Sequence, residues 1–171
     1  MARLGKAVFG RRDRPPAEAV GVLAHGEHVV SWADTANEDV VLATPRGLWW
    51  PDPAGRRRIA WEHVDKVVWQ DNILSVIEAE VVDDALLVDR PAVYAKLTVP
   101  RDLPPVIRKR VQQNIVKNEL LAIAGGGVRF VARKLPGRDG LVWWARLEPG
   151  TPDTATVRSA ISARLAILRQ E

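Results

Sequence analysis

The sequence predicts an α+β fold in which an antiparallel β-roll or barrel is closed by an amphipathic helix and extended by a β-hairpin and a terminal helix. Short runs rich in Val, Ile, Leu and Trp, separated by close turns, fill residues 28 to 99, as is typical of antiparallel sheets. After Pro100 the apolar residues recur at steps of three and four, which is the period of a helix. A length of 171 residues with 47% apolar content suits one domain with a single sizeable core.

Eight strands are expected in the first part of this pattern. Alternation is clearest over 93–99, where Val93, Ala95 and Leu97 share one face and polar residues take the other. Gly, Pro, Asn and Asp mark the intervening turns, including 45–47 and 51–55. The expected strands are 28–32, 40–44, 48–50, 58–61, 64–69, 73–79, 86–88 and 93–99.

Two longer helices and a hairpin follow. Residues 103–124 are predicted to form one helix, with Pro104 in its first turn and Gly125-Gly126-Gly127 as its C-terminal stop. Residues 128–135 and 141–147 read as a hairpin. A last helix is expected over 152–170, with Thr151 as its cap and an apolar stripe of Val157, Ile161, Leu165 and Leu168.

The predicted organisation has three parts. Residues 1–16 are expected to be a flexible basic arm that ends at a Pro-Pro pair. Residues 17–124 would form the roll with its closing helix, after a short helix near 17–24. Residues 125–171 would be a hairpin-helix extension packed on the same core.

Composition excludes several classes of function. The chain has no cysteine, so it has no disulfide, thiolate zinc site or cysteine nucleophile. No stretch reads as an export signal or a membrane span, and we expect a cytoplasmic protein that is either free or peripheral to the membrane. The net charge of +4 leaves weak attraction to anionic partners open.

Three segments resemble the bacterial pleckstrin-homology-like (PH-like) family, in which a Gly-Glu pair leads into a strand, a Thr-x-Arg-x-Leu step follows, and an amphipathic segment ends in an I/V-x-x-V step. The segments are 26–30 (GEHVV), 41–50 (VLATPRGLWW) and 59–67 (IAWEHVDKV). The chain departs from the family by placing Pro45 and Gly47 within the second element.

This resemblance covers about residues 26–124. It implies a bent seven-stranded roll closed by the 103–124 helix, and a non-enzymatic binding or scaffolding role, with the later hairpin and helix as additions. Phosphoinositide-binding relatives carry a basic loop between the first two strands. The corresponding residues here, 33–39, are acidic and would repel a polyphosphate head group.

Tryptophan supplies the first candidate contact residues, because seven tryptophans stand beside one tyrosine and two phenylalanines. Trp49-Trp50 and Trp143-Trp144 are adjacent pairs, and neighbours in a strand point to opposite faces. One ring of each pair is therefore either covered by another element, such as a terminal helix, or available as an anchor for a protein partner.

Two basic clusters, Arg56–Arg58 and Arg108–Arg110, supply the other candidate contact residues. Each cluster is either a solvated face or a contact surface. The candidate partner-binding residues are Trp49, Trp50, Trp143, Trp144, Arg56, Arg57, Arg58, Arg108, Lys109 and Arg110.

The sequence thus favours a non-catalytic interaction or scaffolding module that binds another protein. The alternative is electrostatic binding of nucleic acid or an anionic membrane through residues 3–14, 56–58 and 108–117. A third hypothesis is a small metal-dependent hydrolase using His25, His28 and His63. No catalytic residue, resident metal or cofactor is predicted.

Overall fold

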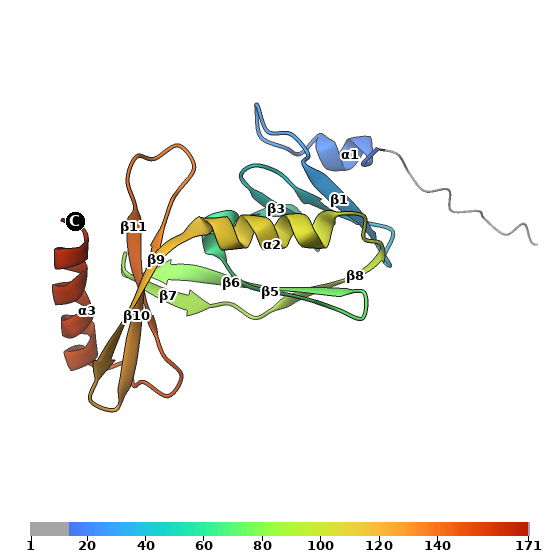
Figure 1. Ribbon diagram of the computed structural model, residues 1–171. Coiled ribbons are helices and arrows are strands. Elements are labelled where there is room, and N and C mark those ends of the chain that lie inside the picture. The colour runs from blue at the N-terminus through green and yellow to red at the C-terminus, as the bar shows by residue number, and fades with distance from the viewer. Residues whose placement is uncertain (1–13, 171) are drawn as a thin grey trace, which may run out of the picture.

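The computed structural model describes residues 14–170, and these form an α+β fold in which eleven strands build one open, mixed sheet with helices against it (Figure 1). The predicted sheet-rich α+β class is confirmed, but the sheet does not close into a barrel. Most of the predicted basic arm, residues 1–13, lies outside the described residues. None of the helices in residues 14–170 is long and apolar enough to cross a membrane.

The first four strands form an antiparallel meander. They are β1 (Ser31–Thr35), β2 (Val40–Ala43), β3 (Gly47–Asp52) and β4 (Gly55–Ala60). All four residues of β2 are buried, because Val41 and Ala43 face the main core while Val40 and Leu42 pack on the other side. That second side also holds Ala19 of α1 (Ala17–Val20).

A ten-residue strand, β6 (Ile73–Val82), connects the two halves of the sheet. Its first part pairs with β5 (Val64–Gln70) on one edge and with β8 (Val93–Val99) on the other, and β8 continues to β1. Its last part pairs with β7 (Leu86–Asp89). A single 3₁₀ turn, η1 (Trp61–His63), carries the chain from β4 to β5.

The segment after β8 differs from its prediction. Only α2 (Leu103–Asn114) is helical, and β9 (Ile115–Ile123) follows it without a loop. The prediction of one helix over 103–124 is therefore wrong in its second half, because β9 pairs along its length with β10 (Gly126–Arg133). Of the glycines predicted to stop a helix, Gly125 lies in the β9–β10 turn with a φ of 83°, and Gly126 and Gly127 begin β10.

The predicted hairpin is present as β10 paired with β11 (Val142–Leu147), and β11 also pairs with β7 in parallel. The last helix, α3 (Ala155–Leu168), buries the predicted apolar stripe. It begins later than predicted, because Thr154 and not Thr151 is its N-cap. The Thr151 hydroxyl instead bonds the backbone of Gly127 at 3.0 Å.

Two main apolar clusters result. The first lies under α2 and draws on β1 to β6 and β8, with Leu103 and Ile107 as the buried helix residues. The second lies between α3 and the β10–β11 hairpin and includes Phe130 and Trp143. The hairpin and α3 therefore share a cluster with Leu86 of β7. The three-part domain division remains a prediction.

A buried arginine joins these halves. Arg133, at the end of β10, donates from Nη1 to the carbonyl oxygens of Glu62 (2.9 Å) and Val64 (3.1 Å). Its Nη2 lies 3.7 Å from Asp65, whose carboxylate also pairs with Arg146 at 2.8 Å. Burial lowers the pKa of Arg133, and the charge of Asp65 opposes this shift.

We expect Arg133→Met to lower the free energy of unfolding by about 3–5 kcal/mol, because it leaves buried polar partners unpaired. Arg129→Met is the control, since Arg129 of the same strand pairs with Glu148 at a partly exposed site and such pairs contribute about 0–1 kcal/mol. Urea unfolding of both variants measures the difference. Equal stability of the two variants would contradict the role of Arg133.

We also expect Gly47→Ala to destabilise the fold by more than about 1 kcal/mol. A Cβ at Gly47 would lie 2.3 Å from the carbonyl oxygen of Ile59, within the β3–β4 ladder. Gly21→Ala is the matched control, because its φ of −64° suits alanine and its nearest neighbour lies at 3.4 Å. Thermal unfolding should show a lower midpoint for Gly47→Ala only.

Candidate functional site

The paired tryptophans lie in four different apolar clusters. Trp50 belongs to the cluster under α2, Trp143 to the α3 cluster, and Trp144 to a small cluster with Leu87. Each of these three rings is buried, so they are core residues and not exposed anchors for a partner. The terminal helix α3 helps to cover Trp143. Burial by a terminal helix was the alternative to a partner contact in the sequence analysis.

Trp49 is half-buried and held by a carboxylate that the sequence analysis did not single out as a site residue. Its Nε1 donates to Glu27 at 3.1 Å, and Thr44 donates a short hydrogen bond to the same carboxylate. The backbone N–H of Ala24 and the guanidinium of Arg58 contact the other oxygen at 3.2 and 3.4 Å. This network fixes the segment before β1 onto β2, β3 and β4.

The arginines of β4 are neutralised. Arg56 pairs with Asp39 and donates to the carbonyl of Val40 at 2.6 Å. Arg57 pairs with Glu78 at 2.6 Å and lies 3.6 Å from Asp52. With Arg58 bound to Glu27, the Arg56–Arg58 cluster presents little uncompensated positive charge.

The histidines do not converge. His63 contacts the carbonyl of Ala79 at 3.0 Å and stacks on Trp144 with 5.7 Å between ring centroids. His25 and His28 are exposed in the segment before β1. Across residues 14–170 no three side chains of the His, Asp and Glu types gather closely enough to hold a metal ion.

Uncompensated positive charge is found around α2. Arg108, Lys109 and Arg110 lie on the helix, as the sequence indicates, and three more basic residues come from β5 and the β10–β11 loop. None of the six side chains has an ion pair or hydrogen bond with residues 14–170. This α2 basic cluster consists of Lys66, Arg108, Lys109, Arg110, Lys134 and Arg138.

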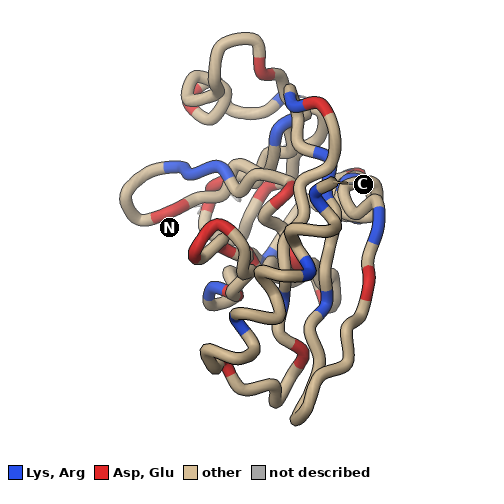
Figure 2. The backbone as a smooth tube through the Cα atoms, turned by 90° about the vertical axis from the view of Figure 1, so that its left-hand side faces the viewer, with Lys and Arg blue, Asp and Glu red and all other residues tan. Residues whose placement is uncertain are grey.

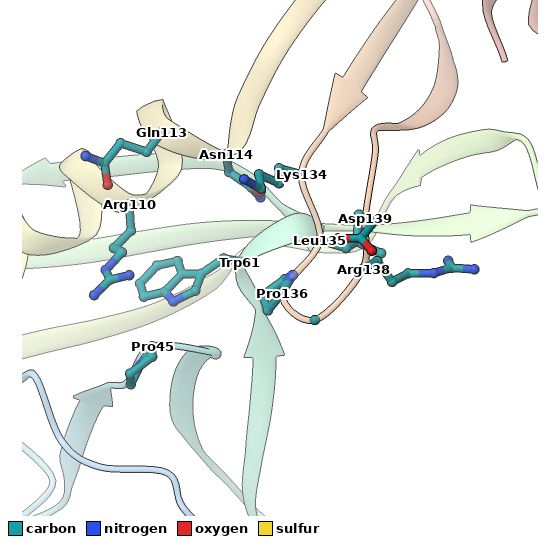
Figure 3. Close-up of a pocket in the computed structure, with 11 residues that line it drawn as sticks. Pro45, Trp61, Arg110, Gln113, Asn114, Lys134, Leu135, Pro136, Arg138 and Asp139 are labelled. Carbon is teal, nitrogen blue, oxygen red and sulfur yellow. The ribbon is translucent and has the colours of Figure 1, made fainter. Parts of the chain in front are cut away.

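A pocket of about 560 Å³ opens at the C-terminal end of α2 (Figure 3). Figure 3 shows Arg110 reaching toward Trp61. Asn114 is only 8% exposed, and its Nδ2, itself buried, has no hydrogen-bond partner within the described chain. This α2 pocket is lined further by Pro45 and residues 135–139. It combines apolar walls with three basic side chains and the carboxylate of Asp139.

A second hollow, of about 680 Å³, lies between α2 and β5. Val67 and Trp69 of β5 supply apolar surface, Lys66, Arg108 and Lys109 supply positive charge, and Asp65 supplies a carboxylate. We refer to it as the α2 groove. Sequence analysis could not find either hollow, because Lys66, Trp69 and Lys134 reach α2 only through the fold.

Charge elsewhere is mixed. Figure 2 shows Lys and Arg interspersed with Asp and Glu along the chain. The strand and α3 arginines meet carboxylates, as in Arg129–Glu148 and Arg158–Asp153. The α2 region is therefore the best-supported candidate site within residues 14–170.

Comparisons of the chain with known protein families, with curated proteins and with solved structures give no match.

The Glu27 network yields a pH-dependent prediction. Burial alone would raise the pKa of Glu27, but hydrogen bonds from Thr44, Trp49 and Ala24, with the charge of Arg58, lower it below its ordinary 4.5. Its stabilising contribution is present above the unfolded pKa and lost as the pH falls through the folded value.

Glu27→Gln should therefore cost roughly 1–3 kcal/mol at pH 7, as for hydrogen bonds to charged groups. The difference from the unchanged protein should shrink below the ordinary pKa of 4.5. Glu18→Gln is the control, because Glu18 is exposed. Chemical unfolding at several pH values measures both, and a difference that does not depend on pH would refute the ionised Glu27 network.

Proposed function

We propose that this protein is a non-catalytic interaction module that binds an acidic segment of another protein at the α2 pocket and α2 groove. The observation that carries this proposal is the α2 pocket itself, where Arg110, Lys134 and Arg138 have no ion pair with residues 14–170 and lie beside the apolar surface of Trp61 and Pro45. A bound anion supplies the opposite charge that these side chains lack.

A carboxylate matches this chemistry. It can accept from the ammonium group of Lys134 and the guanidinium of Arg110, which line the α2 pocket with Asn114 (Figure 3), and such charge-assisted bonds are strong. The apolar side chains of a peptide can pack on Trp61 and Pro45. The α2 groove offers Trp69 and Arg108 for a continuation of the same segment.

The fold lends support to a PH-like assignment, which we include in the proposal. Seven strands follow one another in the order β4-β3-β2-β1-β8-β6-β5, and α2 packs against β1, β2 and β5. A bent seven-stranded roll with a closing helix is what the sequence resemblance implies. Strands β7 and β9–β11 and helix α3 would then be additions with their own apolar cluster.

Nucleic acid and anionic membranes compete for the same cations. We favour protein because the cations flank apolar walls containing Trp61 and Pro45, and because the arginines of β4 are already paired. A long polyanion would need a continuous basic track, and its affinity would fall steeply with salt.

Binding can be measured by the anisotropy of a fluorescein-labelled peptide of alternating Glu and Leu. We expect Arg110→Glu/Lys134→Glu to weaken binding at least about tenfold, because two attractive charges become repulsive. Lys96→Glu is the control, since Lys96 is exposed on β8 away from both hollows. Equal loss in the control, or none in the double variant, would overturn the site.

Asn114→Leu separates binding from folding. Because the substitution removes a buried donor without a partner, thermal stability should stay level or rise, whereas peptide binding should weaken several-fold because the lining of the α2 pocket changes shape and polarity. Single-stranded RNA and anionic vesicles are tested beside the peptide at low and high salt. Tighter binding to either, lost at high salt, would favour the electrostatic alternative.

A further inference from the structure

Strand β9 lies at one end of the sheet, with β10 as its only paired neighbour. Its other edge therefore carries backbone N–H and C=O groups that no strand of residues 14–170 pairs, which makes it a template for another strand. Apolar side chains on this strand are exposed, with Val116 at 48% and Leu120 at 55%. Natural proteins seldom leave a nine-residue edge with exposed apolar residues without a use for it.

The sequence of β9 is symmetric in chemistry about Asn118, one residue before the middle of the strand. Asn118 is flanked by Lys117 and Glu119, which carry opposite charges at equal distance. One position further out stand Val116 and Leu120, both apolar, and Ile115 and Leu121 repeat the pattern beyond them. In an antiparallel pair of two identical strands, residues at equal distance from the two-fold axis face each other.

We infer that two copies of this chain associate through antiparallel pairing of their β9 strands, with Asn118 on the two-fold axis. In this register Lys117 faces the partner's Glu119, and Val116 faces the partner's Leu120. Directly opposed opposite charges and apolar pairs both stabilise a sheet. The two sheets join edge to edge, and the contact is isologous, so each edge is used once.

The charges of β9 suit this pairing. Glu119 is already held by Arg164 of α3 through two bonds of 2.7 and 2.6 Å. A carboxylate has further lone pairs and can accept from a lysine as well. Lys117 has no ion pair with any of residues 14–170, and the partner's Glu119 supplies one.

The opposite end of the sheet does not offer the same pairing. Its edge strand, β4, has three consecutive arginines at Arg56–Arg58, next to Pro51 and Pro53 in and after β3. Charged residues and prolines discourage edge-to-edge association. Pairing through β9 therefore closes a dimer instead of starting a fibre.

A cysteine cross-link tests the register. The chain has no cysteine, so Asn118→Cys introduces its only thiol. Directly opposed residues of antiparallel strands have Cα atoms about 4.5–5.5 Å apart, which is within the range a disulfide spans. Mild oxidation of the full chain should therefore give a covalent dimer, whereas Lys96→Cys on β8 should stay largely monomeric. A monomeric Asn118→Cys under these conditions would overturn the register.

A charge exchange tests the contact itself. By analytical ultracentrifugation the unchanged chain should reach twice its monomer mass as concentration rises. Lys117→Glu should raise the dimer dissociation constant at least about tenfold, because like charges then face each other. The exchange Lys117→Glu/Glu119→Lys/Arg164→Glu, which keeps opposite charges between residues 119 and 164, should restore much of the association, and Lys96→Glu should leave it unchanged. A chain that is monomeric throughout, or a Lys117→Glu variant that dimerises normally, would refute the inference.

Discussion

The buried guanidinium of Arg133 holds together two halves of the molecule that otherwise have separate apolar clusters. It extends from the end of β10 to the carbonyl oxygens of Glu62 and Val64, which flank the turn between η1 and β5. A charged group at this depth needs such partners, because an unpaired buried charge is costly. Asp65 and Arg146 complete the arrangement on the β11 side.

This same contact sets the walls of the α2 pocket. Trp61 precedes Glu62 in the chain and forms one wall, while Lys134 follows Arg133 and lines the other side. The distance between the two walls thus depends on hydrogen bonds made by their sequence neighbours. The third side is the last turn of α2, which contributes Asn114. A polar contact that joins two apolar clusters therefore also shapes the proposed binding site.

The proposed binding site and the proposed dimer contact are neighbours in the chain. Asn114 is the last residue of α2 and Ile115 the first of β9, with no loop between helix and strand. A rigid connection of this kind would hold the two α2 pockets of a dimer in a defined relation. Two linked sites favour a bivalent partner, because the second binding event becomes intramolecular.

Local patterns in the sequence were enough to predict many elements. The alternation in 93–99, the turn at Pro45–Gly47, the β10–β11 hairpin and the stripe of α3 depend on short-range periodicity and turn chemistry. The second half of the predicted 103–124 helix was mistaken because its apolar residues fit both a helical and a strand period. Pairing with β10 decided between them.

Only the tertiary structure decided which candidate residues are free to contact a partner. The sequence shows that Arg56–Arg58 and Arg108–Arg110 are equally basic, but only the fold brings Asp39, Glu78 and Glu27 to the first cluster and leaves the second without carboxylate partners within residues 14–170. In the same way, adjacency in a strand predicts that paired tryptophans face opposite sides, while burial of both sides depends on which elements pack there. Periodicity acts between near neighbours, whereas charge neutralisation and burial depend on residues far apart in the chain, and those meet only in the folded protein.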